Sequence, residues 1–218
     1  MKCGITKKAF TLAEVLITLG IIGIVAEMTI PTLMNSVGDQ VNKVGYKKAY
    51  SVASQAWLMA YNDGNVTNCT DWFDGTCNKA NFNEFKKQVK ISKDCGNDTA
   101  SCWNMSGEKS WTNQWPSTSA NSFIDPSGFA WTQLRNSSDT TPEILVDTNG
   151  DKKPNKYGKD RAIFRLWYDP NTSAPKVYII QDCPGVATTE MDINNQNLVC
   201  PSNATSPCWY TSWITGAK

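Results

Sequence analysis

The segment from Phe10 to Met34 constrains the possible fold of this chain more than any other segment does. It is apolar enough to cross a membrane, and it carries an acid near its start. About 20 helical residues at 1.5 Å each span the ~30 Å hydrocarbon core. Glu14 lies four residues inside the run, where a carboxylate costs roughly 2.5–3.5 kcal/mol on insertion scales. A charge this unfavourable suggests a cationic partner, and cleavage just before Phe10 would create one in the new amino terminus.

The residues around this start resemble the prepilin motif of type IV pilins and type II secretion pseudopilins. Lys7, Lys8 and Ala9 are followed by Phe10-Thr-Leu-Ala-Glu14, and the likeness covers about residues 7 to 34. The resemblance implies that a prepilin peptidase cuts between Ala9 and Phe10 and methylates the new amine of Phe10. It also implies that Glu14 pairs with the amino terminus of a neighbouring subunit during filament assembly. Most members have glycine where this chain has Ala9.

Two other interpretations of the run are a secretory signal peptide and an ordinary membrane anchor. A signal peptide has a shorter apolar core and small residues before its cut, and neither fits the residues up to Ala26. An anchor accounts for the length but not for the position of Glu14. The resemblance also assigns a role in assembly to Pro31, where the family commonly has a kinking proline. Glu27 departs from the family, which has a small or apolar residue there.

Length and charge complete the expected organisation. The 218 residues allow one membrane helix and one globular domain. Loss of a leader with Lys2, Lys7 and Lys8 changes the formal charge from +1 to −2, so nucleic-acid binding is not expected. We expect a leader over 1–9, a transmembrane and filament-core helix over 10–34, and an extracytoplasmic domain over 35–218. The implied partners are the peptidase, other subunits, an inner-membrane assembly platform and the membrane itself.

The cysteines predict disulfides and an oxidising compartment. Seven of the eight follow the leader, and three close spacings suit bridges across short loops. Zinc is disfavoured, since the chain has no histidine and no Cys-x-x-Cys pair. An odd number leaves one thiol over, for which Cys183 is our choice, and the connectivity stays open. The spaced candidates are Cys69 with Cys77, Cys95 with Cys102, and Cys200 with Cys208.

The predicted fold is α+β and, through the resemblance, pilin-like: one long helix packed on a small antiparallel sheet, with disulfide-tied loops. The helix is expected from Phe10 to about Tyr61, with a core-facing stripe of Val37, Val41, Val44, Val52, Ala56 and Met59. A short helix is expected over 83–91 within an otherwise loop-rich region. Alternating apolar runs and turn residues predict the strands, over 122–124, 129–134, 143–146, 162–168 and 176–181.

One loop between two of these strands has the composition of a calcium site. Asp147, Asn149 and Asp151 alternate as in a calcium loop, and Asp160 is placed to close the site. The loop lacks the bidentate glutamate of an EF-hand and contains several lysines, which oppose cation binding. Some pseudopilins hold a structural calcium in their sheet region, and the resemblance therefore favours calcium. The alternative is a hairpin loop whose Asp and Asn side chains bond to their own backbone.

Function classes other than a filament subunit have weaker support. Trp72, Trp103, Trp111 and Trp115 lie in the loop-rich region. They predict either the core of a disulfide-bound lobe or an exposed platform, as in a membrane-tethered adhesin. Catalysis is not expected, because histidine, the common general base, is missing and no nucleophile or phosphate motif is found.

Overall fold

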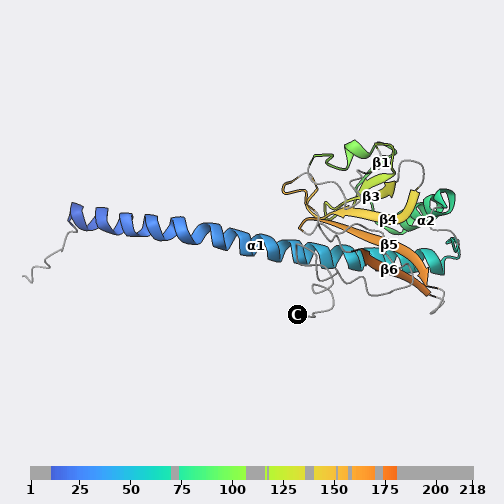
Figure 1. The fold of residues 1–218 in the computed structure, drawn as a ribbon, viewed down its shortest axis with the longest axis horizontal. Helices are drawn as coiled ribbons and strands as arrows, with labels where there is room; N and C mark the ends of the chain where they lie inside the picture. Colours follow the sequence, from blue (N-terminus) through green and yellow to red (C-terminus); the bar gives the residue numbers. More distant parts are fainter. Residues whose placement is uncertain are drawn as a thin grey trace, which may run out of the picture. The chain divides into compact units, whose positions relative to one another are not determined.

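The computed structural model describes residues 11–69, 74–106, 116, 118–135, 140–150, 152–156, 159–169 and 174–180. The chain divides into two compact units, Met1–Val41 and Asn42–Lys218, and helix α1 contributes to both. Figure 1 shows the elements in chain order. They are α1 (Leu12–Asn62), α2 (Gly75–Gln88), β1 (Lys93–Gly96), the 3-10 turn η1 (Thr99–Ser101), β2 (Ser122–Ile124), β3 (Ala130–Arg135), β4 (Thr140–Asp147), β5 (Arg161–Asp169) and β6 (Ala174–Ile180).

The described part of the first unit is the amino-terminal stretch of α1. Its large apolar side chains are exposed, as at Leu16 and Ile22. The stretch is long and apolar enough to cross a membrane. Pro31 lies within α1, which continues to Asn62. The predicted helix therefore agrees with the observed one to within two residues at the described ends.

The second unit is built on a six-stranded antiparallel sheet in the order β1-β2-β3-β4-β5-β6. Each strand pairs antiparallel with the next in sequence, and no crossover connection interrupts this order in the described sheet. Register shifts interrupt the pairing between Asp94 and Gly96 and between Gln133 and Arg135. The predicted α+β class is confirmed. β1 and η1 were not predicted, because their sequence is polar and rich in Asp, Gly and Cys.

The stripe of α1 that packs on the sheet differs from the predicted one. Tyr46, Ala49, Ala53, Trp57 and Ala60 are buried at helical spacing. The ring of Tyr46 lies 5.4 Å from that of Phe164 in β5, and Trp57 Nε1 donates to the Trp167 carbonyl at 3.0 Å. Of the six predicted residues, only Ala56 is buried, while Val37, Val41, Val44 and Met59 are exposed. The prediction was wrong because it ranked valine above alanine as a core residue.

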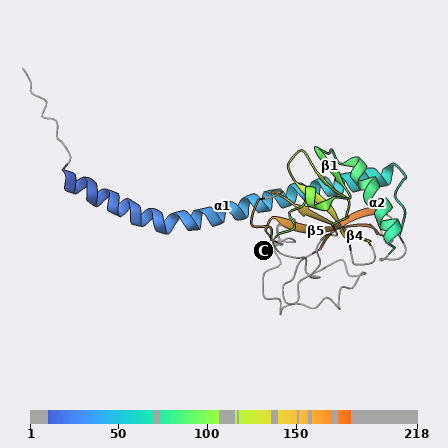
Figure 2. The same ribbon diagram turned by 90° about the horizontal axis from the view of Figure 1, so that it is seen from above.

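Helix α2 covers the same sheet face beside α1 (Figure 2). Phe82 and Phe85 pack against Phe123 and Trp131. α2 begins eight residues before the predicted Asn83, since Asp74 caps it by accepting from the Cys77 N–H at 3.0 Å. It ends at Gln88, three residues before the predicted end.

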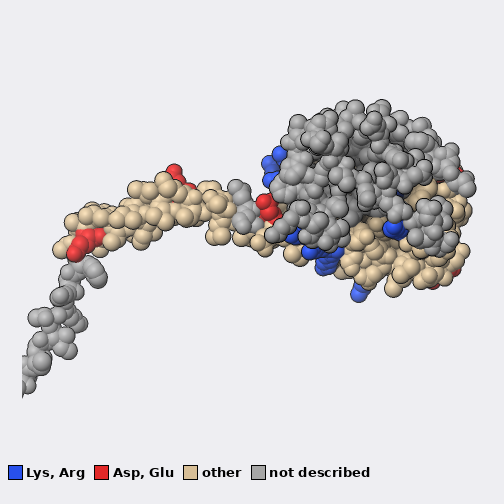
Figure 3. Space-filling view, turned by 60° about the horizontal axis from the view of Figure 1, so that its bottom comes forward, with Lys and Arg blue, Asp and Glu red and all other residues tan. Residues whose placement is uncertain are grey.

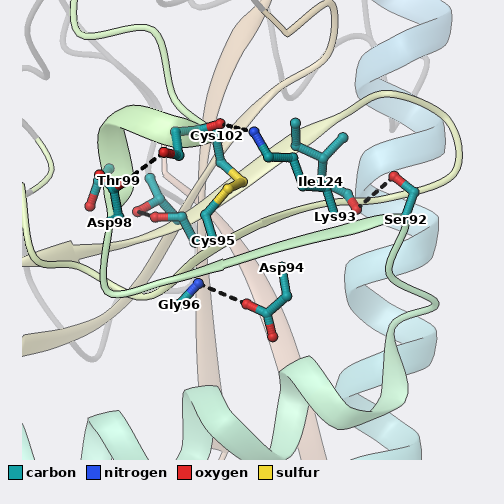
Figure 4. The surroundings of a disulfide bond; sticks show 12 residues. Ser92, Lys93, Asp94, Cys95, Gly96, Asp98, Thr99, Cys102 and Ile124 are labelled. Carbon is teal, nitrogen blue, oxygen red and sulfur yellow. Dashed lines mark hydrogen bonds between the residues drawn. A yellow bond between two sulfur atoms is a disulfide. The ribbon is translucent and has the colours of Figure 1, made fainter.

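Two short disulfides stabilise the region between α1 and β2. Cys69 pairs with Cys77 and Cys95 with Cys102, as their spacing suggested. Figure 4 shows the second bridge joining β1 to the residue after η1. Asp94 Oδ1 accepts from the Gly96 N–H at 2.8 Å beside it. The bridge holds the segment that leads into Trp103, which is 1% exposed and belongs to the core on the other sheet face.

Gly45 lies where α1 approaches the β4–β5 loop. A Cβ atom at Gly45 would lie 3.1 Å from Thr148 Cβ. This is tighter than most Cβ contacts, so Thr148 would have to move by a few tenths of an ångström to accept a side chain at residue 45.

We therefore expect Gly45→Val to lower the free energy of unfolding by about 1–3 kcal/mol, the usual cost of overpacking. Urea denaturation of the full chain in detergent, followed by tryptophan fluorescence, measures this. Gly38→Val is the matched control, because a Cβ at Gly38 meets nothing within 4 Å. Adding Thr148→Gly to the Gly45→Val variant should restore most of the loss. Equal stability of the two valine variants would show that the contact is unimportant.

Candidate functional site

The first turn of α1 holds Glu14 in a reciprocal cap with Thr11. Glu14 Oε2 accepts from the Thr11 backbone N–H at 2.9 Å and from its hydroxyl at 2.8 Å. In return, Thr11 Oγ1 accepts from the Glu14 N–H at 3.2 Å. This is a capping box, in which a threonine and a glutamate three residues later satisfy each other's backbone donors. This contact was not predicted from sequence, although the Thr-x-x-Glu spacing of residues 11 and 14 is the pattern of a capping box.

Glu14 is exposed and surrounded by exposed apolar side chains such as Val15 and Leu16. Both cap contacts use Oε2, and no contact with a described residue involves Oε1. The carboxylate is thus oriented by its own chain and still has one oxygen for another donor. Ala9 and Phe10, the predicted cleavage and methylation positions, lie outside the described residues. Glu27, the departure from the family pattern, is exposed on the same helix.

The predicted ion loop is closed by its own hydrogen bonds around Asp160. Asp160 Oδ2 accepts from the Asn155 N–H at 2.7 Å and from Asn149 Nδ2 at 2.9 Å. Asp160 Oδ1 accepts from the Lys156 N–H at 2.7 Å. Asp160 is 1% exposed, so these three donors replace the water that it loses on burial.

Asp147 is paired with a buried arginine. Arg161 Nε donates to Asp147 Oδ2 at 2.9 Å, and both side chains are within 1% of full burial. The guanidinium also lies over the ring of Trp103, 4.8 Å from its centre, and donates to the Asn104 carbonyl. Burial raises the pKa of Asp147 to about 6 and the nearby Asp160 adds to this, while the contact with Arg161 opposes it. Desolvation therefore outweighs the ion pair at this carboxyl.

In this arrangement two of the predicted calcium ligands are already bonded to other groups. Both oxygens of Asp160 are bonded to N–H donors, and Arg161 supplies the positive charge next to Asp147. One observation favours an ion, since Asn149 Oδ1 is buried without a hydrogen-bond partner. Asp151 lies outside the described residues, and the described ones contain no group of three potential acid or thiol ligands. The contacts match the alternative of a self-bonded loop, and calcium stays a prediction.

A second acid–arginine pair lies on the same sheet face. Arg165 Nη2 donates to Glu143 Oε1 at 2.8 Å, with both residues buried. Glu143 is opposite Arg165, and Asp147 is opposite Arg161, across β4 and β5. The pairs flank Leu145 and Ile163 in the core on this face. Neither pair was predicted from sequence, although the matching four-residue spacing of acids in one strand and arginines in the next could have indicated them.

The remaining predicted site residues are only partly described. Trp103 is buried, in agreement with a lobe core, whereas Trp72, Trp111 and Trp115 lie outside the described residues. Cys200 and Cys208, and the supposed free thiol Cys183, lie outside them as well.

Comparison with protein-family models, with curated proteins and with solved structures found no match to this chain. Any functional conclusion therefore depends on the residues and their geometry.

The buried pair leads to a pH-dependent prediction. Arg161→Met leaves a buried carboxylate without its partner, and we expect a loss of about 3–5 kcal/mol in unfolding free energy at pH 8. The loss should shrink near pH 5. Asp147 is protonated in the folded state below its raised pKa of about 6, and the variant raises that pKa further, so a neutral carboxyl no longer needs the arginine.

Denaturation of both proteins at pH 5 and pH 8 measures this difference. Arg161→Met/Asp147→Leu should recover most of the stability, since it removes the stranded charge, and exposed Lys153→Met is the surface control. A loss that is the same at both pH values would mean that lost packing on Trp103, and not charge, is responsible.

Proposed function

We propose that the chain is a structural subunit of a filament, a type II secretion pseudopilus or a type IV pilus, with a pilin-like fold. The observation that carries this proposal is the amino-terminal stretch of α1. It presents exposed apolar side chains in its membrane-length stretch and one acid in its first turn. The second unit adds what such a subunit needs, a helix packed on an antiparallel sheet.

The proposed work of the subunit is mechanical. A prepilin peptidase removes residues 1–9 at the inner membrane, and an assembly platform then transfers the helix from lipid into a bundle of like helices. Packing against neighbours replaces lipid contact along the exposed apolar side chains from Leu12 to Met34. The two disulfides favour an oxidising compartment for the domain, which supports an extracytoplasmic location. Secretion, motility and uptake share this mechanism.

Glu14 sets the register of the bundle by pairing with the amine of Phe10 on an adjoining copy. The capping box supports this role because it orients the carboxylate through Oε2 and leaves Oε1 for the amine. A charge-assisted bond in apolar surroundings is strong, and an unpaired carboxylate there is costly. The pair therefore favours one axial position of each subunit over its neighbours.

Two variants separate assembly from helix capping. Glu14→Gln keeps an N3 side chain able to complete a capping box but removes the charge, and we expect normal membrane insertion with filament yield reduced at least about tenfold. Thr11→Ala removes the cap and keeps the charge. It should cost about 1 kcal/mol of helix stability and reduce filament yield much less than Glu14→Gln does, because the carboxylate that pairs with the amine is kept.

Membrane fractionation and electron microscopy of sheared filaments measure the two effects. Glu27→Gln is the matched control for loss of an acid on the same helix. Normal yield from Glu14→Gln with failure of Thr11→Ala would mean that Glu14 acts only as a helix cap, and the filament assignment would lose its main support.

Processing gives an independent prediction. Ala9→Leu places a bulky side chain before the proposed cut and should leave the leader attached, whereas Ala9→Gly should be processed as the parent chain is. Mass spectrometry of the amino terminus shows either outcome directly. A parent chain that keeps Met1, or is cut well after Met34, would contradict the proposal.

A further inference from the structure

We propose that six lysines of the Asn42–Lys218 unit form a collar that binds anionic phospholipid headgroups of the anchoring membrane. The proposal rests on the membrane anchoring within the proposed function and adds a lipid partner to it. The collar lysines come from the part of α1 in this unit and from the β4–β5 loop. They are Lys43, Lys47, Lys48, Lys152, Lys153 and Lys159, all exposed.

The two sets of lysines belong to one end of the unit. Those of α1 lie between residues 43 and 48, five helical rises or about 7.5 Å along the helix axis. The β4–β5 loop lies next to this part of α1, because a Cβ at Gly45 would be only 3.1 Å from Thr148 Cβ in the loop. Lys48 Nζ lies 5.6 Å from the ring centre of Phe129. Gly150 of the β4–β5 loop is close to the turn between β2 and β3 that contains Phe129, since a Cβ at Gly150 would lie 3.3 Å from the Gly128 carbonyl oxygen.

The positive charge of the collar is not neutralised within the described part of the chain. The described acids at the two ends of the loop, Asp147 and Asp160, are buried and bonded to Arg161 and to loop N–H groups. No collar lysine forms an ion pair with a described acid. The lysine ion pairs that the structure shows join Lys86 to Asp94 and Lys87 to Glu84. Figure 3 shows Lys and Arg side chains (blue) exposed on the domain surface.

The chain itself keeps the collar near the membrane. Lys43 follows Met34, the end of the apolar run, by nine residues, which span at most about 30 Å even when fully extended. Anionic headgroups attract lysines near the surface, and the disulfides indicate the extracytoplasmic leaflet, where phosphatidylglycerol is a suitable probe. An acidic surface on a second copy is the competing partner, and it becomes an outcome of the test.

The test uses the full chain in nanodiscs, one copy per disc, made of phosphatidylcholine alone or with phosphatidylglycerol. Lysine acetylation is followed residue by residue with mass spectrometry. Collar lysines should react about fivefold more slowly in the anionic discs, and 1 M salt, with a screening length of about 3 Å, should remove the difference. Lys79 is the internal control. It is exposed and lies in α2. The neighbouring Asn78 carbonyl accepts from Gln133 Nε2, and Gln133 pairs with Ile144, three residues before the end of β4 where the β4–β5 loop begins.

Variants and alternative outcomes make the test decisive. Lys43→Gln/Lys47→Gln/Lys48→Gln should weaken the protection of Lys152, Lys153 and Lys159, while Lys79→Gln should not. Equal collar rates in both disc types would overturn the collar, and so would protection that appears only with two copies per disc, which indicates an interface between copies. A chain that fails to elute with discs would instead refute the membrane anchoring and, with it, the collar.

Discussion

The small-residue stripe of α1 is the constraint on which the second unit depends. Gly45, Ala49, Ala53 and Ala60 let the helix backbone approach the sheet and its loops closely. Aromatic rings of Tyr46 and Trp57 fill the space between them and contact β5. Because alanine fills the contact face, the larger residues Val44 and Met59 remain exposed. The same helix thus packs on its own sheet through small residues and two aromatic rings, and presents Val44 and Met59 outward.

Strands that form apolar runs next to turn residues could be predicted, and elements defined by a specific contact could not. The runs at 122–124 and 162–168 are followed by Asp-Pro pairs that contain Pro126 and Pro170, and the observed β2 and β5 lie on these runs. The start of α2 depends on the Asp74 cap next to a disulfide, within residues whose composition indicates a loop. The core stripe of α1 was missed because hydrophobicity does not report which face must come closest, where a small side chain fits better than a large one.

The candidate sites show the same division. Sequence indicated that Glu14 needs a partner, and the structure adds that Thr11 donates two hydrogen bonds, from its N–H and its hydroxyl, to one oxygen of Glu14. Sequence also indicated an ion between Asp147 and Asp160, because alternating acids resemble ligands. In the structure the cation beside Asp147 is Arg161, which is directly opposite in the next strand. A ligand pattern within one loop cannot reveal which charged residue lies opposite it in the neighbouring strand, and calcium stays a prediction.

In the proposed function, the lysine collar and Glu14 have opposite effects on the subunit: the collar favours the membrane-bound state, and Glu14 favours the assembled state. While α1 is in the membrane, lysines such as Lys43 and Lys152 would hold the domain at anionic headgroups, each contributing about 1 kcal/mol near the surface. In the proposed filament assembly, extraction of the helix would break these contacts, and the proposed pairing of Glu14 with a neighbour's amine would offset that loss. Salt screens the exposed lysines but hardly affects a charge pair surrounded by apolar side chains. The ratio of membrane-held to assembled subunits should therefore depend on ionic strength and on anionic lipid content through the collar, while register depends on Glu14.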